Sequence, residues 1–278
     1  LRENEHASSS FFKNWIEYCR EGRVHPSYHV STTKTFRLSC TEPALQQVPR
    51  GSLYRELFVP REGYKMAVVD YSQIEPRLIA HYSGDPVLVQ IFKEGHDLYE
   101  HIAREVLKYG GTSEELKYKD KIVRNVAKRI ALSAFYGIGA RKFAYRLKIE
   151  TGQGVTIPEA RRYLNDYFAM LSGVVEFRKY LVSRLQQDPK IITVLGRPLF
   201  FKPEEFTHLA FNKLIQCTGS DINLEAQVDL QKYFLSRQLD CACVHLVHDE
   251  AIFEYKIEQE KEVLSAIDWF MAERYRDL

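Results

Sequence analysis

The order of apolar and polar residues predicts short strands towards both ends of the chain and helices between them. An apolar run over residues 66–69, short enough for a buried strand, leads directly into Asp70. A second apolar strand runs up to His248-Asp249 and a third leaves from Ala251, which predicts a β-hairpin with acids at its tip. Helical patterns cover residues 11–19, the stretch that follows Glu75 and is interrupted by a turn at Gly84-Asp-Pro86, and residues 87–93, 98–108, 124–136, 158–186 (one helix, or two that meet at Ser172-Gly173), 206–234 and 258–275, and a second hairpin is predicted for 191–201. This order favours one α+β domain with a helical subdomain.

Asp70 and Asp249 are candidate ligands of a divalent cation. Each carboxylate ends an apolar strand, where removing a charge from water is costly unless something pairs with it. Mg²⁺ takes oxygen ligands and usually keeps only one or two protein carboxylates, which leaves room for substrate phosphates. The simpler alternative is that the two acids are unrelated, since acids at strand ends are common in loops.

Basic residues gather in one stretch, although the net charge of the chain is only +2. Between residues 117 and 148 ten residues are Lys or Arg and only Asp120 is acidic, so a local positive field would attract a polyanion. Within this stretch, one stripe of a helix carries Arg124, Lys128, Leu132 and Tyr136, which recur every four residues. Two cations, an apolar residue and an aromatic hydroxyl match the order of a triphosphate, a sugar and a base. A helix with a solvated basic start and a buried end is the alternative.

Composition places the chain among globular proteins. Its 278 residues suffice for one large domain or two closely joined ones, and it has neither an apolar run of transmembrane length nor a signal peptide. Five cysteines without a CxxC pair suggest reduced thiols inside a cell. A strand alternation would place Cys241, Cys243 and His245 on one face, and with His248 they could suggest zinc. Their spacing matches no usual structural zinc site, so we expect buried strand residues.

Six stretches, in order, resemble the motifs of family A DNA polymerases. Asp70-Tyr-Ser-Gln-Ile-Glu-Pro-Arg77 resembles DYSQIELR with Pro76 for Leu, and His248-Asp249-Glu250 is identical to the third palm motif. The stripe from Arg124 to Gly137 resembles RxxxKxxxFxxxYG, with Leu132 where Phe or Tyr is usual. Residues 35–40, 43–49 and 216–221 resemble TGRLSS, PNLQNIP and QGTAAD, with Phe36 for Gly and Ala44 for Asn.

The resemblance implies a right-hand polymerase fold of the α+β class, with an antiparallel palm sheet and a helical fingers subdomain. Residues 1–30 would be a residual thumb or connector, 31–87 and 205–278 the palm, and 88–204 the fingers. Because the sequence begins with Leu1, we expect a fragment or processed product that lacks most of the thumb, any exonuclease domain and a strand beyond Leu278. The departures from the motifs indicate a divergent member, with a phage origin left open.

The resemblance also implies an activity, which is template-directed DNA synthesis. A primer 3′-hydroxyl would attack the α-phosphate of a dNTP and release pyrophosphate, with two Mg²⁺ ions that Mn²⁺ can replace. The implied catalytic residues are Asp70, Asp249, Glu250 and Lys128, and the implied metal ligands are Asp70, Asp249 and the carbonyl of Tyr71. The nucleotide would contact Tyr71, Gln73, Glu75, Arg124, Lys128, Leu132 and Tyr136, with Glu75 excluding ribose. The DNA would contact Arg37, Gln46, Gln47, Asn212, Gln216 and His248. Tyr99 stands where the family usually has a phosphate-contacting histidine.

Two alternatives stay open at this point. A single-subunit RNA polymerase shares both aspartates, but Glu75 argues against it because that position is small where ribose must fit. A non-catalytic nucleic-acid-binding relative would be expected to lose an acid or Lys128, and both are present. We expect primer-template DNA and dNTPs as partners, no membrane, and a monomer. Its expected location is intracellular, in the cytoplasm or nucleoid, or in the host cytoplasm for a viral protein.

Overall fold

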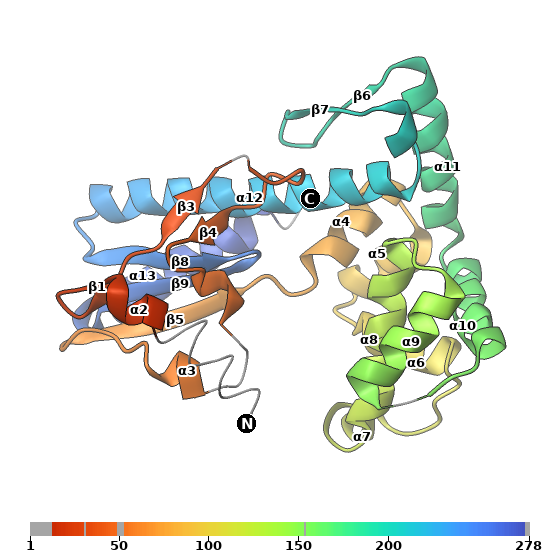
Figure 1. Cartoon of the computed structure of the whole chain (residues 1–278), viewed down its shortest axis with the longest axis horizontal. Helices are drawn as coiled ribbons and strands as arrows, with labels where there is room; N and C mark the ends of the chain where they lie inside the picture. The colour runs from red at the N-terminus through yellow and green to blue at the C-terminus, as the bar shows by residue number, and fades with distance from the viewer. Residues whose placement is uncertain (1–12, 31, 49–52, 153, 276–278) are drawn as a thin grey trace. The chain divides into compact units, whose positions relative to one another are not determined.

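The computed structural model describes residues 13–30, 32–48, 53–152 and 154–275 (Figure 1). The chain forms two compact units. Unit 1 comprises Leu1–Ile74 and Gln216–Leu278, and unit 2 comprises Glu75–Ile215. The boundaries expected for palm and fingers lie 11 to 13 residues away, at 87/88 and 204/205, and the assignment of these names to segments remains a prediction. No helix among the described residues is both long and apolar enough to span a bilayer.

Unit 1 is built on a three-stranded antiparallel sheet. Its strands are β5 (Tyr64–Asp70), β8 (Cys241–Val247) and β9 (Glu250–Lys256), in the order β5-β9-β8. The predicted strand and the predicted hairpin are thereby confirmed. One face is covered by the second half of α12 (His208–Ser236) and by α13 (Glu260–Met271), whose apolar residues pack on Ala251, Phe253 and Tyr255 (Figure 1). The last predicted helix is shorter than expected, because 3₁₀ turns at Ile257–Gln259 and Glu273–Tyr275 flank α13.

The N-terminal part of unit 1 is made of short elements, and the predicted helix over residues 11–19 ends at Glu17. They are α2 (Lys13–Glu17), the pairs β1 (Cys19–Arg20) with β2 (Arg23–Val24) and β3 (Ser27–His29) with β4 (Ser39–Thr41), the 3₁₀ turn η2 (Leu45–Gln47) and α3 (Leu53–Glu56). A small core of Trp15, Cys40 and Leu45 holds them together. The buried Glu254 of β9 pairs with Arg23 and Arg61 at 2.9 Å each, so the charge is compensated. Phe11 and Phe12, part of the predicted first helix, lie outside the described residues.

The cysteines of β8 correct one expectation. The register of β8 against β9 shifts between Cys243, which faces Phe253, and His245, which faces Ile252. Successive residues of a strand point to opposite faces, so this irregularity separates His245 from Cys243 and breaks the predicted common face. Burial raises the pKa of both the Cys241 and the Cys243 thiol to about 12, which keeps them protonated. Cys241 is buried and Cys243 half-buried, as expected of strand residues.

Unit 2 is mainly helical. Its elements are α4 (Ile74–Ser83), α5 (Pro86–Lys93), α6 (Leu98–Glu105), α7 (Ser113–Tyr118), α8 (Lys121–Phe135), α9 (Ala140–Thr151), α10 (Ile157–Met170), α11 (Ser172–Gln187), the hairpin of β6 (Lys190–Ile192) and β7 (Pro198–Phe200), the turn η3 (Pro203–Glu205) and the start of α12. The predicted helices and hairpin are confirmed, and the 158–186 region is a pair of helices. The sequence pattern had not predicted α7 and α9, although Thr112 and Glu115 form a capping box at the start of α7.

Asp85 joins two helices of unit 2 through one fully buried carboxylate. Its Oδ1 accepts the N–H groups of Val87 and Leu88 at the start of α5, both at 3.1 Å. Its Oδ2 accepts the N–H groups of Gly173 and Val174 at the start of α11, at 2.8 and 3.3 Å. The approach requires glycine at 173, because a Cβ there would lie 2.8 Å from the Asp85 Cα. A single side chain therefore caps both helices.

Replacement of Asp85 should strongly destabilise unit 2. Asp85→Ala leaves four backbone donors without their acceptor, and we expect a loss of about 3 kcal/mol in the free energy of unfolding. The measurement is urea unfolding followed by circular dichroism. Thr112→Ala, which removes the exposed cap of α7, is the matched control and should cost about 1 kcal/mol. Equal costs for the two variants would show that Asp85 acts only as an ordinary surface cap.

Candidate active site

The two aspartates predicted at strand ends lie at the same end of the unit 1 sheet. In the antiparallel pairing of β5 with β9, Asp70 is opposite Glu250, the residue that follows Asp249. The backbone N–H of Tyr71 donates to the carbonyl oxygen of Asp249 at 3.4 Å. Asp70 is exposed and Asp249 half-buried. The sheet thus brings together two acids that are 179 residues apart in the chain.

Helix α12 supports the tip of the β8–β9 hairpin through a hydrogen bond. The turn consists of His248 and Asp249, and His248 has a left-handed backbone with φ +58°. Asn223 of α12 is almost fully buried, and its Nδ2 donates to the His248 carbonyl at 2.9 Å. Gln227, one turn further on, donates in turn to Asn223 Oδ1 at 3.1 Å. The sequence reasoning missed Asn223; two amides spaced four residues apart on one helix were the available signal.

Glu250 differs from the two aspartates in its surroundings. Its side chain is buried, and Oε1 lies 3.8 Å from Arg55 Nη1 without accepting a hydrogen bond among the described residues. A buried carboxylate beside an arginine is already compensated in charge. Glu250 is therefore less suited to bind a cation than Asp70 and Asp249.

The donor set at the end of the sheet fits a hard divalent cation. Asp70 and Asp249 offer carboxylate oxygens on an accessible edge, which are the ligands that Mg²⁺ prefers. The ring of Tyr71 packs into the core beneath the sheet, and burial raises the pKa of its hydroxyl well above the ordinary value. Only its backbone carbonyl is then available as a ligand. Within the described ranges no three His, Cys, Asp or Glu side chains form a metal cluster, so water or substrate would complete the coordination.

The remaining predicted residues of unit 1 differ in their exposure to solvent. Gln46 is committed to the scaffold, because its Nε2 donates to the carbonyls of Leu246 at 2.9 Å and Leu38 at 3.3 Å. The side chain of Gln73 is half-buried, and its Oε1 accepts no hydrogen bond among the described residues, so it suits a hydroxyl donor rather than a phosphate. Gln47 and His248 are exposed, and Arg37 and Gln216 are half-buried.

The backbone around Arg37 takes a shape that glycine would favour. Phe36, which replaces the glycine of the motif it resembles, has φ +57°, in the left-handed region that bulky residues rarely adopt. Its carbonyl accepts a hydrogen bond from Ser220 Oγ of α12 at 3.0 Å. The loop therefore keeps its left-handed turn despite the substitution, with α12 as its support.

The predicted stripe of unit 2 lies on the accessible side of α8. Lys128 is exposed, and Arg124, Leu132 and Tyr136 are half-buried. The opposite side, which includes Ala127, Ile130, Ala131, Ala134 and Phe135, is buried in the helical core. Lys128 has no ion-pair partner among the described residues. The amphipathic pattern thus places two cations and a hydroxyl-bearing ring on one accessible helix face.

Arg124 is held by groups at the start of α6. Its Nη2 lies 2.5 Å from Asp97 Oδ2, and its guanidinium carbon lies 5.5 Å from the centre of the Tyr99 ring. Asp97 is also the N-cap of α6, where it accepts the N–H of Tyr99 at 2.8 Å. Burial, and then the charge of Asp97, raises the pKa of the Tyr99 hydroxyl. Tyr99 therefore carries no charge at neutral pH where the family usually has a histidine.

Tyr136 and Glu75 form the other contact of the stripe. The Tyr136 hydroxyl donates to Glu75 Oε2 at 2.5 Å, which joins the end of α8 to the first turn of α4. Gly137 then ends α8 with φ +67°, and a Cβ there would lie 2.6 Å from the His208 ring. Glycine is thus required twice, for the turn and for the packing of His208. Asn212, one turn beyond His208 on α12, is half-buried.

The chain is similar to DNA polymerases of known sequence. The model of DNA polymerase family A matches residues 1–278. DNA polymerase I of Mycobacterium tuberculosis is 32% identical over 248 residues, which cover 84% of this chain and 26% of that protein. DNA polymerase I of Pseudomonas aeruginosa is 32% identical over 263 residues, which cover 89% and 27%.

A solved structure of this kind is also similar. The POL domain of Pol1 from M. smegmatis, in complex with DNA primer-template and dNTP, matches with a TM-score of 0.85 and 27% identity over 99% of this chain and 49% of that one. The chain spans about a quarter of the length of the curated relatives named above. On the family match over its whole length, the chain belongs to DNA polymerase family A.

Proposed function

We propose that this protein is a template-directed DNA polymerase that adds dNMP units to a primer 3′-hydroxyl and releases pyrophosphate. The observation that carries the proposal is that Asp70 and Asp249 lie at the same end of the sheet. Asp70 is paired with Glu250, and the Tyr71 N–H donates a hydrogen bond to the Asp249 carbonyl. Membership of family A supports it, as does the likeness to a polymerase domain bound to DNA primer-template and dNTP. A monomeric state and an intracellular location belong to the same proposal.

Asp70 and Asp249 hold the divalent cations in this proposal, with the Tyr71 carbonyl as a third protein ligand. Two Mg²⁺ ions, or Mn²⁺ in their place, supply charge neutralisation to the attacking and leaving oxygens when bound. The protein's part is positioning, because phosphoryl transfer needs in-line geometry more than covalent chemistry. Asn223 and the β5–β9 pairing fix the two carboxylates, and Glu250 with Arg55 stabilises the end of the strand.

The stripe on α8 binds the nucleotide in this proposal. Arg124 and Lys128 hold the β- and γ-phosphates, and Lys128 is placed to protonate the leaving pyrophosphate. The phosphates compete with Asp97 for Arg124, so the ion pair keeps the guanidinium in place until substrate arrives. Leu132 and Tyr136 pack on the sugar and base, and Tyr71, Gln73 and Glu75 complete the nucleotide contacts. Contacts to primer and template come from Arg37, Gln46, Gln47, Asn212, Gln216 and His248.

The first test of the function removes each strand-end charge without changing its shape. Asp70→Asn or Asp249→Asn should abolish primer extension while the melting temperature and most of the affinity for primer-template DNA are retained, because each carboxylate serves the cations rather than the core. Asp268→Asn on the exposed side of α13 is the matched control and should extend normally.

The same assay separates the alternative functions. Extension with dNTPs, its absence with NTPs, and its loss in EDTA are expected. Extension with NTPs alone would identify an RNA polymerase, and DNA binding without extension under every metal condition would identify a non-catalytic relative. Near-normal extension by either aspartate variant would exclude that aspartate as a ligand of the catalytic cations.

Sugar selection should depend on Glu75. Its carboxylate is fixed by the Tyr136 hydroxyl, and the proposal places it against the 2′ position of the incoming sugar. Glu75→Ala should therefore raise the kcat/KM for rNTPs relative to dNTPs by about tenfold or more, with some loss of dNTP efficiency. The measurement is the ratio of the two kcat/KM values. A ratio equal to that of the parent protein would exclude Glu75 as the selecting residue.

Leu132 should make the protein discriminate strongly against dideoxynucleotides. Leucine has no hydroxyl that could replace the missing 3′-hydroxyl of the substrate. Leu132→Tyr should lower the dNTP/ddNTP ratio of kcat/KM by at least tenfold, since one recovered hydrogen bond of about 1.5 kcal/mol corresponds to roughly that factor. Leu132→Phe is the control, because it adds the ring alone. An unchanged ratio in the tyrosine variant would mean that Leu132 does not face the sugar.

A further inference from the structure

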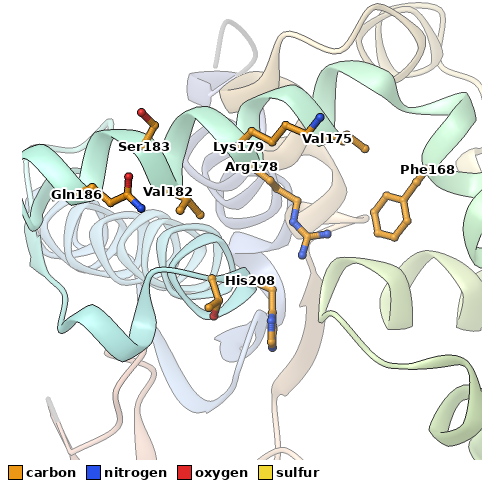
Figure 2. Close-up of a pocket in the computed structure, with 9 residues that line it drawn as sticks. Phe168, Val175, Arg178, Lys179, Val182, Ser183, Gln186 and His208 are labelled. Carbon is orange, nitrogen blue, oxygen red and sulfur yellow. The ribbon is translucent and has the colours of Figure 1, made fainter.

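A hollow of about 600 Å³ lies in unit 2 between α11 and the start of α12 (Figure 2). The side chains that line it are Phe168, Val175, Arg178, Lys179, Val182, Ser183, Gln186, Thr207 and His208. It contains three basic side chains, two hydroxyls and one amide, and no acidic side chain. None of the residues predicted from the motifs lines this hollow.

Arg178 is the unusual member of this hollow. Its guanidinium carbon lies 5.4 Å from the centre of the Phe168 ring and 5.5 Å from that of Phe211. In Figure 2 the guanidinium points away from α11 into the space between Phe168 and His208. Burial lowers the pKa of Arg178 below its ordinary value. Among the described residues no carboxylate pairs with it.

A half-buried guanidinium without an anion is an unfavourable choice for packing alone. Two phenyl rings compensate part of the charge, but they accept none of the five N–H donors in the plane of the group. An apolar side chain would fill the same gap between the rings without the desolvation cost. A planar fork in a hollow that is also lined by basic and hydroxyl-bearing side chains instead matches the oxygens of a phosphate group.

The position of the hollow indicates where such a phosphate would come from. His208, on its wall, packs against Gly137, at the end of the α8 stripe. A nucleic acid strand at the base end of that stripe would pass close to His208. Because the site is recessed between helices, a flexible single strand can enter it more readily than a rigid duplex.

We propose that this hollow, the Arg178 pocket, binds a backbone phosphate of single-stranded DNA, with the guanidinium of Arg178 as the principal contact. The choice of ligand rests on the proposed polymerase function. The pocket itself is tested by binding rather than by nucleotide addition, so a failure of the one is distinguishable from a failure of the other.

The test measures the affinity of the chain for a fluorescein-labelled single-stranded 20-mer by anisotropy at several salt concentrations. Arg178→Met should weaken binding about tenfold, which is the value of one hydrogen-bonded charge contact. It should also lower the slope of log K against log salt by about 0.7, the value for one phosphate contact on a single strand. Lys93→Gln, which removes one exposed charge from α5 of the same unit, is the matched control and should change the affinity less than twofold.

Further variants make the outcome decisive. The melting temperature of Arg178→Met should equal or exceed that of the parent protein. If it is lower, Arg178→Lys decides, since it keeps the charge but loses the planar fork and should bind about threefold more weakly. The proposal is overturned if Arg178→Met binds the 20-mer as tightly as Lys93→Gln does. It is also overturned if Arg178→Lys binds the 20-mer as tightly as the parent protein does. Either result would show that Arg178 only packs between the rings. If Arg178→Met loses the binding of inorganic pyrophosphate but keeps the 20-mer affinity of the parent protein, the assignment of the pocket to a DNA strand is overturned.

Discussion

The pairing of β5 with β9 is the constraint on which the candidate active site depends. It places Asp70 opposite Glu250 and so beside the hairpin turn that carries Asp249. Because side chains alternate along a strand, a slip of one residue would turn Asp70 to the other face and separate the carboxylates. The register is fixed by burial: Ala251, Phe253 and Tyr255 of β9 pack on α12 and α13, while Glu254 is held on the other side by Arg23 and Arg61.

In unit 2 the basic side chains of α8 lie on the accessible side of the helix rather than in the core. The apolar side of α8 fills the helical core, which leaves Arg124 and Lys128 on the accessible side. Asp97 holds Arg124 in place through an ion pair, and the same carboxylate also caps the start of α6. Asp85 is the structural counterpart, since its four backbone hydrogen bonds keep α5 and α11 together. Acids at helix starts thus serve both the framework and the proposed nucleotide site.

Features with a local cause could be predicted from the sequence. The apolar run before Asp70, the hairpin around His248-Asp249 and the four-residue spacing from Arg124 to Tyr136 each depend on neighbours in the chain, and the structure confirms these elements. Features that arise from tertiary contacts could not be predicted. The bond from Asn223 to His248, the approach of Asp85 to Gly173, the ion pair of Arg124 with Asp97 and the shifted register at His245 each join distant segments or break a strict alternation. The left-handed Phe36 lies between these cases, because the motif predicts the turn but not the residue that adopts it.

The central claim is that Asp70 and Asp249 bind the same cations at the end of the sheet. The most direct measurement is an anomalous-difference map at the manganese edge, from crystals of the protein with Mn²⁺, a dideoxy-terminated primer-template and a dNTP. We predict a manganese peak within about 2.3 Å of a carboxylate oxygen from both aspartates, with no peak on Glu250. Manganese bound by only one of the two aspartates, or centred either on Glu250 or on the cysteines of β8, would contradict this account.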